Sequence, residues 1–203
     1  MRFAAASFLS LALACAHGAR RAEEGFRDAA DAVPGLVLDI RYATSGNFTG
    51  RVLYPEARCL LRETVAKRLA QVQNDLKNEG LGLKVWDCYR PLAIQKALWK
   101  LVPDPRYVAD PAKGSRHNRG AAVDVTLIDR TGKQLEMPTD YDDFSVKAHR
   151  EDKTASAQAA ANSLRLERAM ARRGFTGLAT EWWHFDADGW RDYPVTDAPL
   201  SRP

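Results

Sequence analysis

The sequence is poor in histidine and cysteine, with four and three respectively among 203 residues. It lacks internal repeats and domain linkers, which excludes a repeat architecture and favours one globular domain. Beyond residue 19 it lacks any apolar stretch of membrane-spanning length. The net charge is only +4, and the basic residues are interspersed with Asp and Glu. Because no basic stripe alternates with aromatic residues, nucleic-acid binding is disfavoured.

The first 19 residues resemble an export signal. Arg2 precedes an apolar run over residues 3–14, which is too short to span a membrane, and small residues follow. The run ends in an imperfect lipobox, so lipid attachment at Cys15 and cleavage after Ala16 or Ala19 are open alternatives. A buried helix is disfavoured because the run has no polar face. We expect an exported, periplasmic protein whose only membrane contact would be a lipid anchor.

Removal or lipidation of Cys15 leaves two cysteines, Cys59 and Cys88. A pair of cysteines in an oxidising compartment favours a disulfide, and two buried free thiols are the alternative. The chain-entropy model gives a disulfide between these two positions about 3.6 kcal/mol of stabilisation.

Hydrophobic periodicity predicts a mixed order of helices and strands. One helix, 61–78, has apolar residues at spacings of three and four and is ended by Gly80 and Gly82. The other expected elements are helices at 91–101 and 154–173, strands at 36–42, 83–88, 121–128 and 180–186, a long loop at 102–120, and a turn at 129–133 with a strand returning to residue 137. This order predicts a single-domain α+β fold, with helices packed on a mostly antiparallel sheet. Residues 20–34 are expected to form a flexible leader, and 35–203 the domain.

Two short clusters, residues 115–124 and 181–184, contain the most reactive side chains. A catalytic zinc commonly takes three protein ligands and leaves one position open for water. His117, Asp124 and His184 supply two nitrogens and one carboxylate, so we predict that they bind one zinc ion per chain at the centre of the fold. Glu181, three residues before His184, is then the candidate general base.

The alternatives for Glu181 are a fourth zinc ligand or a surface carboxylate. An ideal strand would place Glu181 and His184 on opposite faces, so a bulge, twist or short turn is required between them. Arg90, between a strand and a helix, could stabilise negative charge on a tetrahedral intermediate. Read alone, Arg90 is more typical of a surface residue or an ion-pair partner of Asp87.

Taken together, these motifs resemble the VanX-like zinc D-alanyl-D-alanine dipeptidases, a branch of the zinc DD-peptidases. The resemblance spans residues from about 36 to 190 and rests on Arg41-Tyr42-Ala43-Thr44 with Asn47-Phe48-Thr49-Gly50, Trp86 to Pro91, Ser115 to Asp124, Tyr141 to Phe144, and Glu181 to His184. It implies the zinc ligands and base named above, with Arg90 stabilising the transition state. Cys88 stands where the family usually has glycine, and no catalytic side chain is replaced.

The resemblance also implies a substrate-binding set. Asp142 would anchor the free ammonium of the substrate with help from Tyr42, and Ser115 would contact the substrate carboxylate. A one-residue shift would give the role of Asp142 to Asp143. A pocket that reads both termini would select a dipeptide, because a buried carboxylate without its ammonium partner costs several kcal/mol.

The expected activity is therefore hydrolysis of D-Ala-D-Ala to two D-alanines, with no obligate protein partner. One alternative is a DD- or LD-carboxypeptidase acting on peptidoglycan stem peptides, and Asp142 argues against it. Another is a zinc-containing peptidoglycan-binding domain without turnover. A binder would need neither Glu181 nor Arg90, so the presence of both favours an enzyme.

Overall fold

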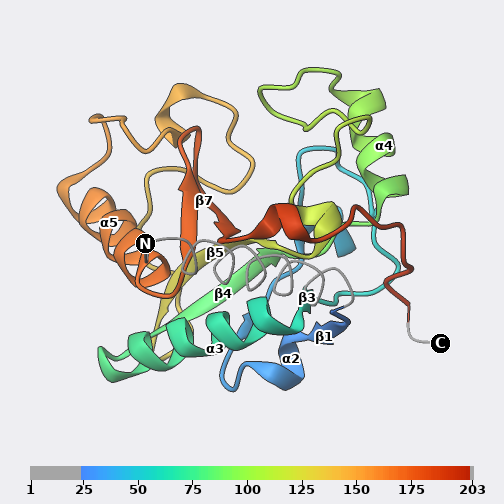
Figure 1. Ribbon diagram of the computed structural model, residues 1–203. Helices are drawn as coiled ribbons and strands as arrows, with labels where there is room; N and C mark the ends of the chain where they lie inside the picture. Colours follow the sequence, from blue (N-terminus) through green and yellow to red (C-terminus); the bar gives the residue numbers. More distant parts are fainter. Residues whose placement is uncertain (1–23, 202–203) are drawn as a thin grey trace, which may run out of the picture.

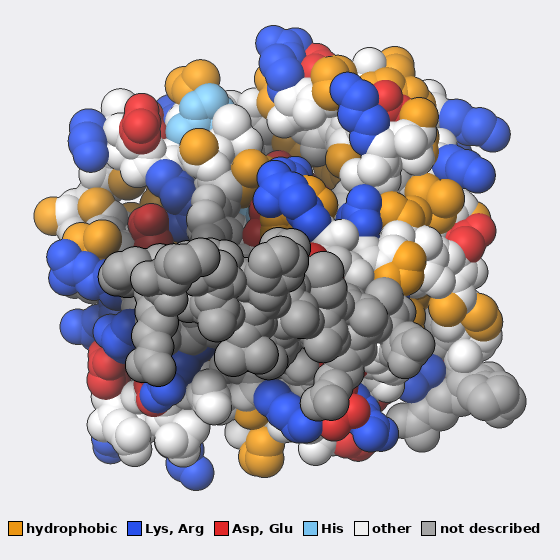
Figure 2. Space-filling view, viewed as in Figure 1, with side chains coloured by type: hydrophobic (Ala, Val, Ile, Leu, Met, Phe, Trp, Pro, Cys, Tyr) orange, Lys and Arg blue, Asp and Glu red, His pale blue; other side chains and the backbone are white. Residues whose placement is uncertain are grey.

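The computed structural model describes residues 24–201. The expected export signal, with Cys15, lies outside the described residues. None of the helices between residues 24 and 201 has the length and apolar character needed to cross a bilayer. On the face shown in Figure 2, basic, acidic and hydrophobic side chains are intermixed over the coloured surface, in keeping with the interspersed charges of the sequence.

A five-stranded sheet forms the centre of the fold (Figure 1). Its strands lie in the order β2 (Val37–Leu38), β4 (Leu81–Asp87), β5 (Ala122–Asp129), β7 (Glu181–Ala187) and β6 (Phe175–Leu178). Only β2 and β4 run parallel; every other neighbouring pair is antiparallel. A second, two-stranded sheet pairs β1 (Phe26–Asp28) with β3 (Leu60–Arg62). The expected α+β fold on a mostly antiparallel sheet is confirmed.

Two of the helices, α3 (Glu63–Asn78) and α5 (Ala157–Ala171), pack against this sheet. The chain also forms α2 (Ala29–Ala32) and α4 (Leu92–Leu101), with short 3-10 turns η1 (Arg41–Ala43), η2 (His117–Arg119), η3 (Val146–Ala148) and η4 (Trp190–Asp192). The predicted apolar face of α3 is buried, including Leu69 and Leu76. Gly80, with φ of +76°, reverses the chain after α3, because this conformation costs glycine little. Gly82 lies inside β4 instead and does not end the helix.

Four expectations need correction. From residue 24 onward, the expected leader is ordered as β1 and α2, because β1 finds a partner in β3. The predicted strand at 36–42 shortens to β2 followed by η1. The strand returning to residue 137 is reduced to one bridge between Ile128 and Gln134. The short strand β6, which pairs with β7, was not anticipated.

Cys59 and Cys88 form a disulfide, as predicted. It ties the start of β3 to the segment that follows β4, and both cysteines are buried. The backbone carbonyl of Cys59 also accepts a hydrogen bond from the N–H of Ala29, 2.7 Å away. The N-terminal elements are thus fixed to the segment that carries Arg90.

Replacing both cysteines by alanine should lower the free energy of unfolding by about 3.6 kcal/mol, because the open chain gains entropy when unfolded. Denaturant unfolding with and without reductant measures this. Reductant should bring the wild type to the stability of the Cys59→Ala/Cys88→Ala variant and leave the variant unchanged. Equal stability of the oxidised wild type and the variant would contradict the expectation.

Candidate active site

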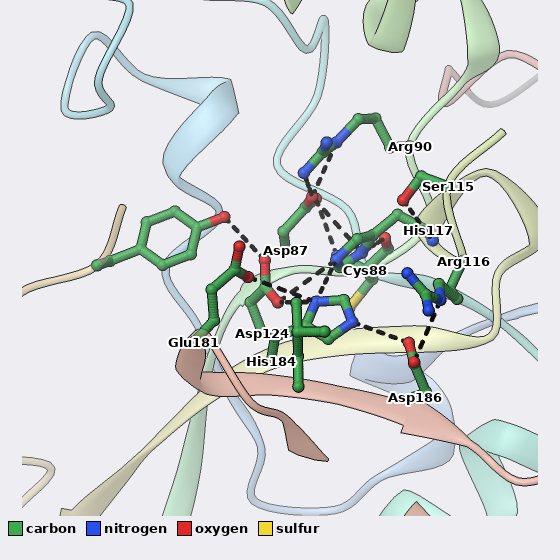
Figure 3. Close-up of polar contacts among 12 residues, drawn as sticks. Asp87, Cys88, Arg90, Ser115, Arg116, His117, Asp124, Glu181, His184 and Asp186 are labelled. Atoms are coloured by element: carbon green, nitrogen blue, oxygen red, sulfur yellow. Dashed lines mark hydrogen bonds and ion pairs between the residues drawn. The ribbon is translucent and has the colours of Figure 1, made fainter. Parts of the chain in front are cut away.

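Strand register places three polar side chains in a row across the sheet. Asp124 of β5 lies opposite Asp87 of β4 on one side and opposite His184 of β7 on the other. Directly paired residues of antiparallel strands point to the same face, so the three side chains converge. All three are buried. His117, from η2 just before β5, reaches the same point (Figure 3).

Three of these side chains form a compact triangle of donor atoms. Nε2 of His117 lies 3.1 Å from Nδ1 of His184, which is 3.0 Å from Oδ1 of Asp124. The third side, from His117 Nε2 to Asp124 Oδ1, measures 3.4 Å. Ligand atoms of a tetrahedral zinc site with bonds of about 2.0–2.2 Å lie about 3.3–3.6 Å apart. The residues present therefore fit zinc in donor type and number, and two of the three separations are only slightly shorter than this range.

Further contacts hold each ligand in the orientation that a metal requires. Nδ1 of His117 lies 2.6 Å from the carbonyl oxygen of Cys88, and Nε2 of His184 lies 2.8 Å from Oδ1 of Asp186. Each ring can donate a proton to its outer partner, which leaves the other nitrogen free for a metal. The hydroxyl of Tyr141 donates to the second oxygen of Asp124 at 2.9 Å.

The electrostatics of the triangle favour a bound cation. Burial alone would raise the pKa of Asp124, but the charges and hydrogen bonds of His117 and His184 outweigh burial and lower it. Burial alone would lower the pKa of His184, but hydrogen bonds to Asp124 and Asp186 raise it to about 10. A metal held at Nδ1 would require the unprotonated nitrogen there, because only neutral imidazole coordinates.

Glu181 reaches the same side as His184 because the strand pairing is irregular. The register of β6 against β7 shifts between Gly177 and Leu178, which supplies the bulge required by the sequence spacing. Oε2 of Glu181 lies 3.9 Å from Nδ1 of His184 (Figure 3). Burial raises the pKa of Glu181, and the nearby His184 only partly opposes this. A carboxyl group with a raised pKa beside a metal site is suited to proton transfer.

Arg90 is buried and fixed on several sides. Its Nε and Nη2 donate to Oδ2 of Asp87 at 3.2 and 2.7 Å, and its Nη1 donates to Gln95 at 2.8 Å. Burial disfavours the charged guanidinium, but Asp87 and neighbouring tyrosines raise the pKa of Arg90 above its usual value. Of the two alternatives raised by the sequence, Arg90 is an ion-pair partner of Asp87 and is not a surface residue. These bonds use three of its five N–H donors, so two are left for a substrate oxygen.

Asp142 lines the pocket that also contains Arg90 and the three candidate zinc ligands, and Asp143 does not line it. Oδ2 of Asp142 accepts a hydrogen bond from the hydroxyl of Tyr42 at 3.0 Å. Burial and the charge of Asp124 raise the pKa of Asp142 well above its usual range. Asp142 is the only residue other than glycine between positions 24 and 201 that has a positive φ, +59°. Strain of this kind is found at functional sites, and here it turns the carboxylate into the pocket.

The pocket has a volume of about 280 Å³ and is lined by Ser115, Arg90, Glu181 and the three candidate zinc ligands. This volume is close to the lower limit of small-molecule sites, about 300 Å³. Aromatic side chains from three loops meet at its wall. The ring centroid of Phe144 lies 5.1 Å from that of Phe48 and 4.8 Å from that of Tyr107. The long loop at 102–120 therefore borders the site through Tyr107. The hydroxyl of Ser115 accepts a bond from the N–H of His117 at 3.2 Å.

Comparison with known proteins identifies the family. The sequence profile of Peptidase M15, described as D-Ala-D-Ala dipeptidase, matches residues 22–198. The chain belongs to this family. A D-alanyl-D-alanine dipeptidase of Escherichia coli is 38% identical over 168 residues, covering 83% of this chain and 87% of the relative. Another, from Streptomyces coelicolor, is 31% identical over 196 residues, covering 80% and 94%.

One solved structure shows a weak similarity to this member of the M15 family in both sequence and fold. The vancomycin resistance D,D-dipeptidase VanXYg in complex with a D-Ala-D-Ala phosphinate analogue is 17% identical, with a TM-score of 0.41. The match covers 81% of this chain and 67% of that one. The family profile and the curated relatives confirm the expected dipeptidase family.

The structure adds two residues to which the sequence patterns gave no role. Asp186 binds the outer nitrogen of His184, and Tyr141 binds the outer oxygen of Asp124. Asp186 could have been found from its spacing, because residues two apart on a strand share a face. Tyr141 lies in one of the motifs that resemble the family, but its contact with Asp124 depends on loop packing that no local pattern encodes.

Asp186→Asn should weaken zinc binding by about 10- to 100-fold, as expected for an outer partner of a ligating histidine. Competition with a chromophoric chelator measures the affinity. The control is Asp129→Asn, at the far end of β5, where the carboxylate accepts bonds within a turn. Wild-type affinity in Asp186→Asn would show that Asp186 does not support His184.

Proposed function

We propose that this protein is a zinc-dependent dipeptidase that hydrolyses D-Ala-D-Ala to two D-alanines. The observation that carries the proposal is the position of Glu181 beside the triangle of His117, Asp124 and His184, in one small pocket with Arg90. The curated relatives are D-alanyl-D-alanine dipeptidases.

Zinc bound by the triangle would supply Lewis-acid chemistry, polarising a carbonyl and making a water molecule more acidic. Glu181 accepts a proton from the attacking water while the water oxygen bonds to the peptide carbon. The carboxyl group then transfers that proton to the leaving amine as the C–N bond breaks. Burial raises the pKa of Glu181, which suits both transfers because the carboxyl group must hold the proton between them.

Arg90 stabilises the negative charge that develops on the former carbonyl oxygen. Asp87 and Gln95 hold the guanidinium rigidly, so its remaining N–H donors need no reorganisation when the charge appears. The ring of Tyr42 lies against it, with the guanidinium carbon 5.1 Å from the ring centroid. This combination of burial and fixed geometry explains why a guanidinium, and not a mobile lysine, suits the position.

Asp142 and Tyr42 are suited to bind the free ammonium of the dipeptide. Burial and the charge of Asp124 raise the pKa of Asp142 more than Arg90 lowers it, and a substrate ammonium would provide a closer counter-charge. Ser115 lines the same pocket, which supports a contact with the substrate carboxylate. A longer peptide acylated at this amine would leave Asp142 buried without a counter-charge, which costs several kcal/mol.

We also infer that the protein is exported and acts in the periplasm on fragments of peptidoglycan metabolism. The disulfide supports this, because such bonds persist in oxidising compartments. The export segment and the choice between lipidation at Cys15 and later cleavage belong to the same proposal. Mass spectrometry of the mature protein from both the membrane and the soluble fractions distinguishes a lipidated Cys15 from a form cleaved after Ala16 or Ala19.

The substrate proposal is tested by D-alanine release from D-Ala-D-Ala, N-acetyl-D-Ala-D-Ala and a muramyl pentapeptide. The zinc-loaded protein should cleave the free dipeptide and leave the other two intact. Asp142→Asn should lower kcat/KM for the dipeptide at least about tenfold, because the charge pair with the ammonium is lost. Preferential cleavage of the pentapeptide would assign the protein to the carboxypeptidases.

Glu181→Gln should bind zinc as the wild type does and lower kcat by about 100- to 10,000-fold, because a carboxamide cannot accept the proton. Zinc content is measured on the same sample as turnover of D-Ala-D-Ala. Glu79→Gln, which alters an exposed carboxylate just after α3 that pairs with surface arginines, is the matched control. Near wild-type turnover in Glu181→Gln would rule out the general-base role.

A further inference from the structure

The hairpin of β6 and β7 contains the irregularity on which the active site depends. Gly177 of β6 lies opposite Phe185 of β7, yet the next residue, Leu178, lies opposite Glu181. Three consecutive residues of β7 therefore have no counterpart on β6. A bulge of this size leaves backbone carbonyls without their ladder partners, and such groups need another donor when they are buried.

One side chain supplies those donors. Nε of Arg150 donates to the carbonyl of Leu178 at 2.8 Å. Its Nη2 donates to the carbonyls of Trp182 and His184 at 2.9 and 3.0 Å. The backbone N–H of Arg150 donates to the carbonyl of Ala179 in the hairpin turn at 2.9 Å. A single residue from the loop before α5 thus binds the turn, the bulge and the backbone of a metal ligand.

The surroundings of Arg150 are built to keep the guanidinium in this place. Its side chain is only 10% exposed, and Nη1 lies 3.5 Å from Oε2 of Glu167 on α5. The guanidinium carbon lies 4.5 Å from the ring centroid of Phe185. A Cβ on Gly177 would collide with the guanidinium, so the absence of a side chain there makes room for it. Gly177 has no positive φ, so the backbone itself does not demand glycine.

We propose that Arg150 is a positioning residue that fixes the β6–β7 bulge and thereby sets the spacing between Glu181 and His184. The 3.9 Å separation of Glu181 Oε2 from His184 Nδ1 depends on the residues between them following the bulged path. An unbulged strand would turn these two side chains to opposite faces. The inference rests on the proposed function, in which Glu181 is the base and His184 a ligand.

Three variants test the role of Arg150 in the full-length protein. Arg150→Met removes the donors and keeps apolar bulk, Arg150→Lys keeps the charge with poorer geometry, and Gly177→Ala displaces the guanidinium without removing it. Arg150→Met and Gly177→Ala should lower kcat for D-Ala-D-Ala by about 10- to 100-fold with little change in KM, because small displacements of reacting groups have effects of this size. Arg150→Lys should recover part of the loss.

A matched control comes from the other end of the same hairpin. Arg68 donates to the carbonyls of Gly174 and Asp188, both at 3.2 Å, so Arg68→Met should weaken the hairpin without touching the bulge. It should lower the melting temperature and leave kcat per bound zinc within about twofold of the wild type, because the base and ligands stay in place. If Arg150→Met does not fold, Gly177→Ala, which retains the arginine, decides the question.

A second readout is independent of turnover. The visible absorption spectrum of the Co²⁺-substituted protein reports the geometry of the metal ligands. It should change in Arg150→Met and Gly177→Ala and remain that of the wild type in Arg68→Met. Wild-type spectra and wild-type kcat per bound metal in both Arg150→Met and Gly177→Ala would overturn the proposal. A wild-type protein inactive on the dipeptide would refute the proposed function alone, and the cobalt spectra would still decide the role of Arg150.

Discussion

The burial of negative charge is the constraint on which the site depends. Five carboxylates share one region of the sheet and its loops: Asp87, Asp124, Asp142, Glu181 and Asp186. An isolated carboxylate in such surroundings is strongly disfavoured, so each must be paired or carry a proton. Asp87 is paired with Arg90 and also accepts from the hydroxyl of Tyr54 at 2.7 Å. Asp186 is paired with His184 and with Arg116, whose Nε lies 3.2 Å away.

The remaining carboxylates differ in a way that follows their proposed roles. The pKa of Asp124 is lowered because two imidazoles face it, and a metal there would complete its pairing. The pKa values of Asp142 and Glu181 are both raised, mainly by burial. The nearby cations only partly oppose burial at these two groups, so they are the ones that can respond to a substrate ammonium or to proton transfer. Differences in pairing thus suit these similar carboxylates to different roles: Asp142 to anchoring the substrate, Asp124 to binding the metal and Glu181 to proton transfer.

Sequence periodicity was sufficient where the determinants are local. The apolar face of α3 and the three central strands follow from spacing alone, and the Glu-x-x-His interval itself required a bulge. Sequence periodicity did not predict the structure where a short segment depends on a distant partner. β1 has three residues and is ordered by pairing with β3, more than thirty positions away. Arg150 lies in a loop about thirty residues before the carbonyls it binds, and no local pattern marks it. The predicted strand after residue 133 does meet the edge of β5, through the Ile128–Gln134 bridge and the bond from the N–H of Leu135 to the carbonyl of Leu127, but the pairing ends there.

Cys88 shows why the departure from the family's glycine is compatible with the chemistry. Its sulfur is bonded to Cys59, its N–H donates to Oδ1 of Asp87 at 2.9 Å, and its carbonyl faces Nδ1 of His117 at 2.6 Å. Cys88 does not line the pocket, and its contact with the candidate ligands is made by its backbone carbonyl. A cross-link at this position therefore restrains the backbone that orients His117 and precedes Arg90, and it adds no group to the pocket. The same covalent bond stabilises the fold and limits the movement of two functional side chains, because both depend on one short segment between β4 and α4.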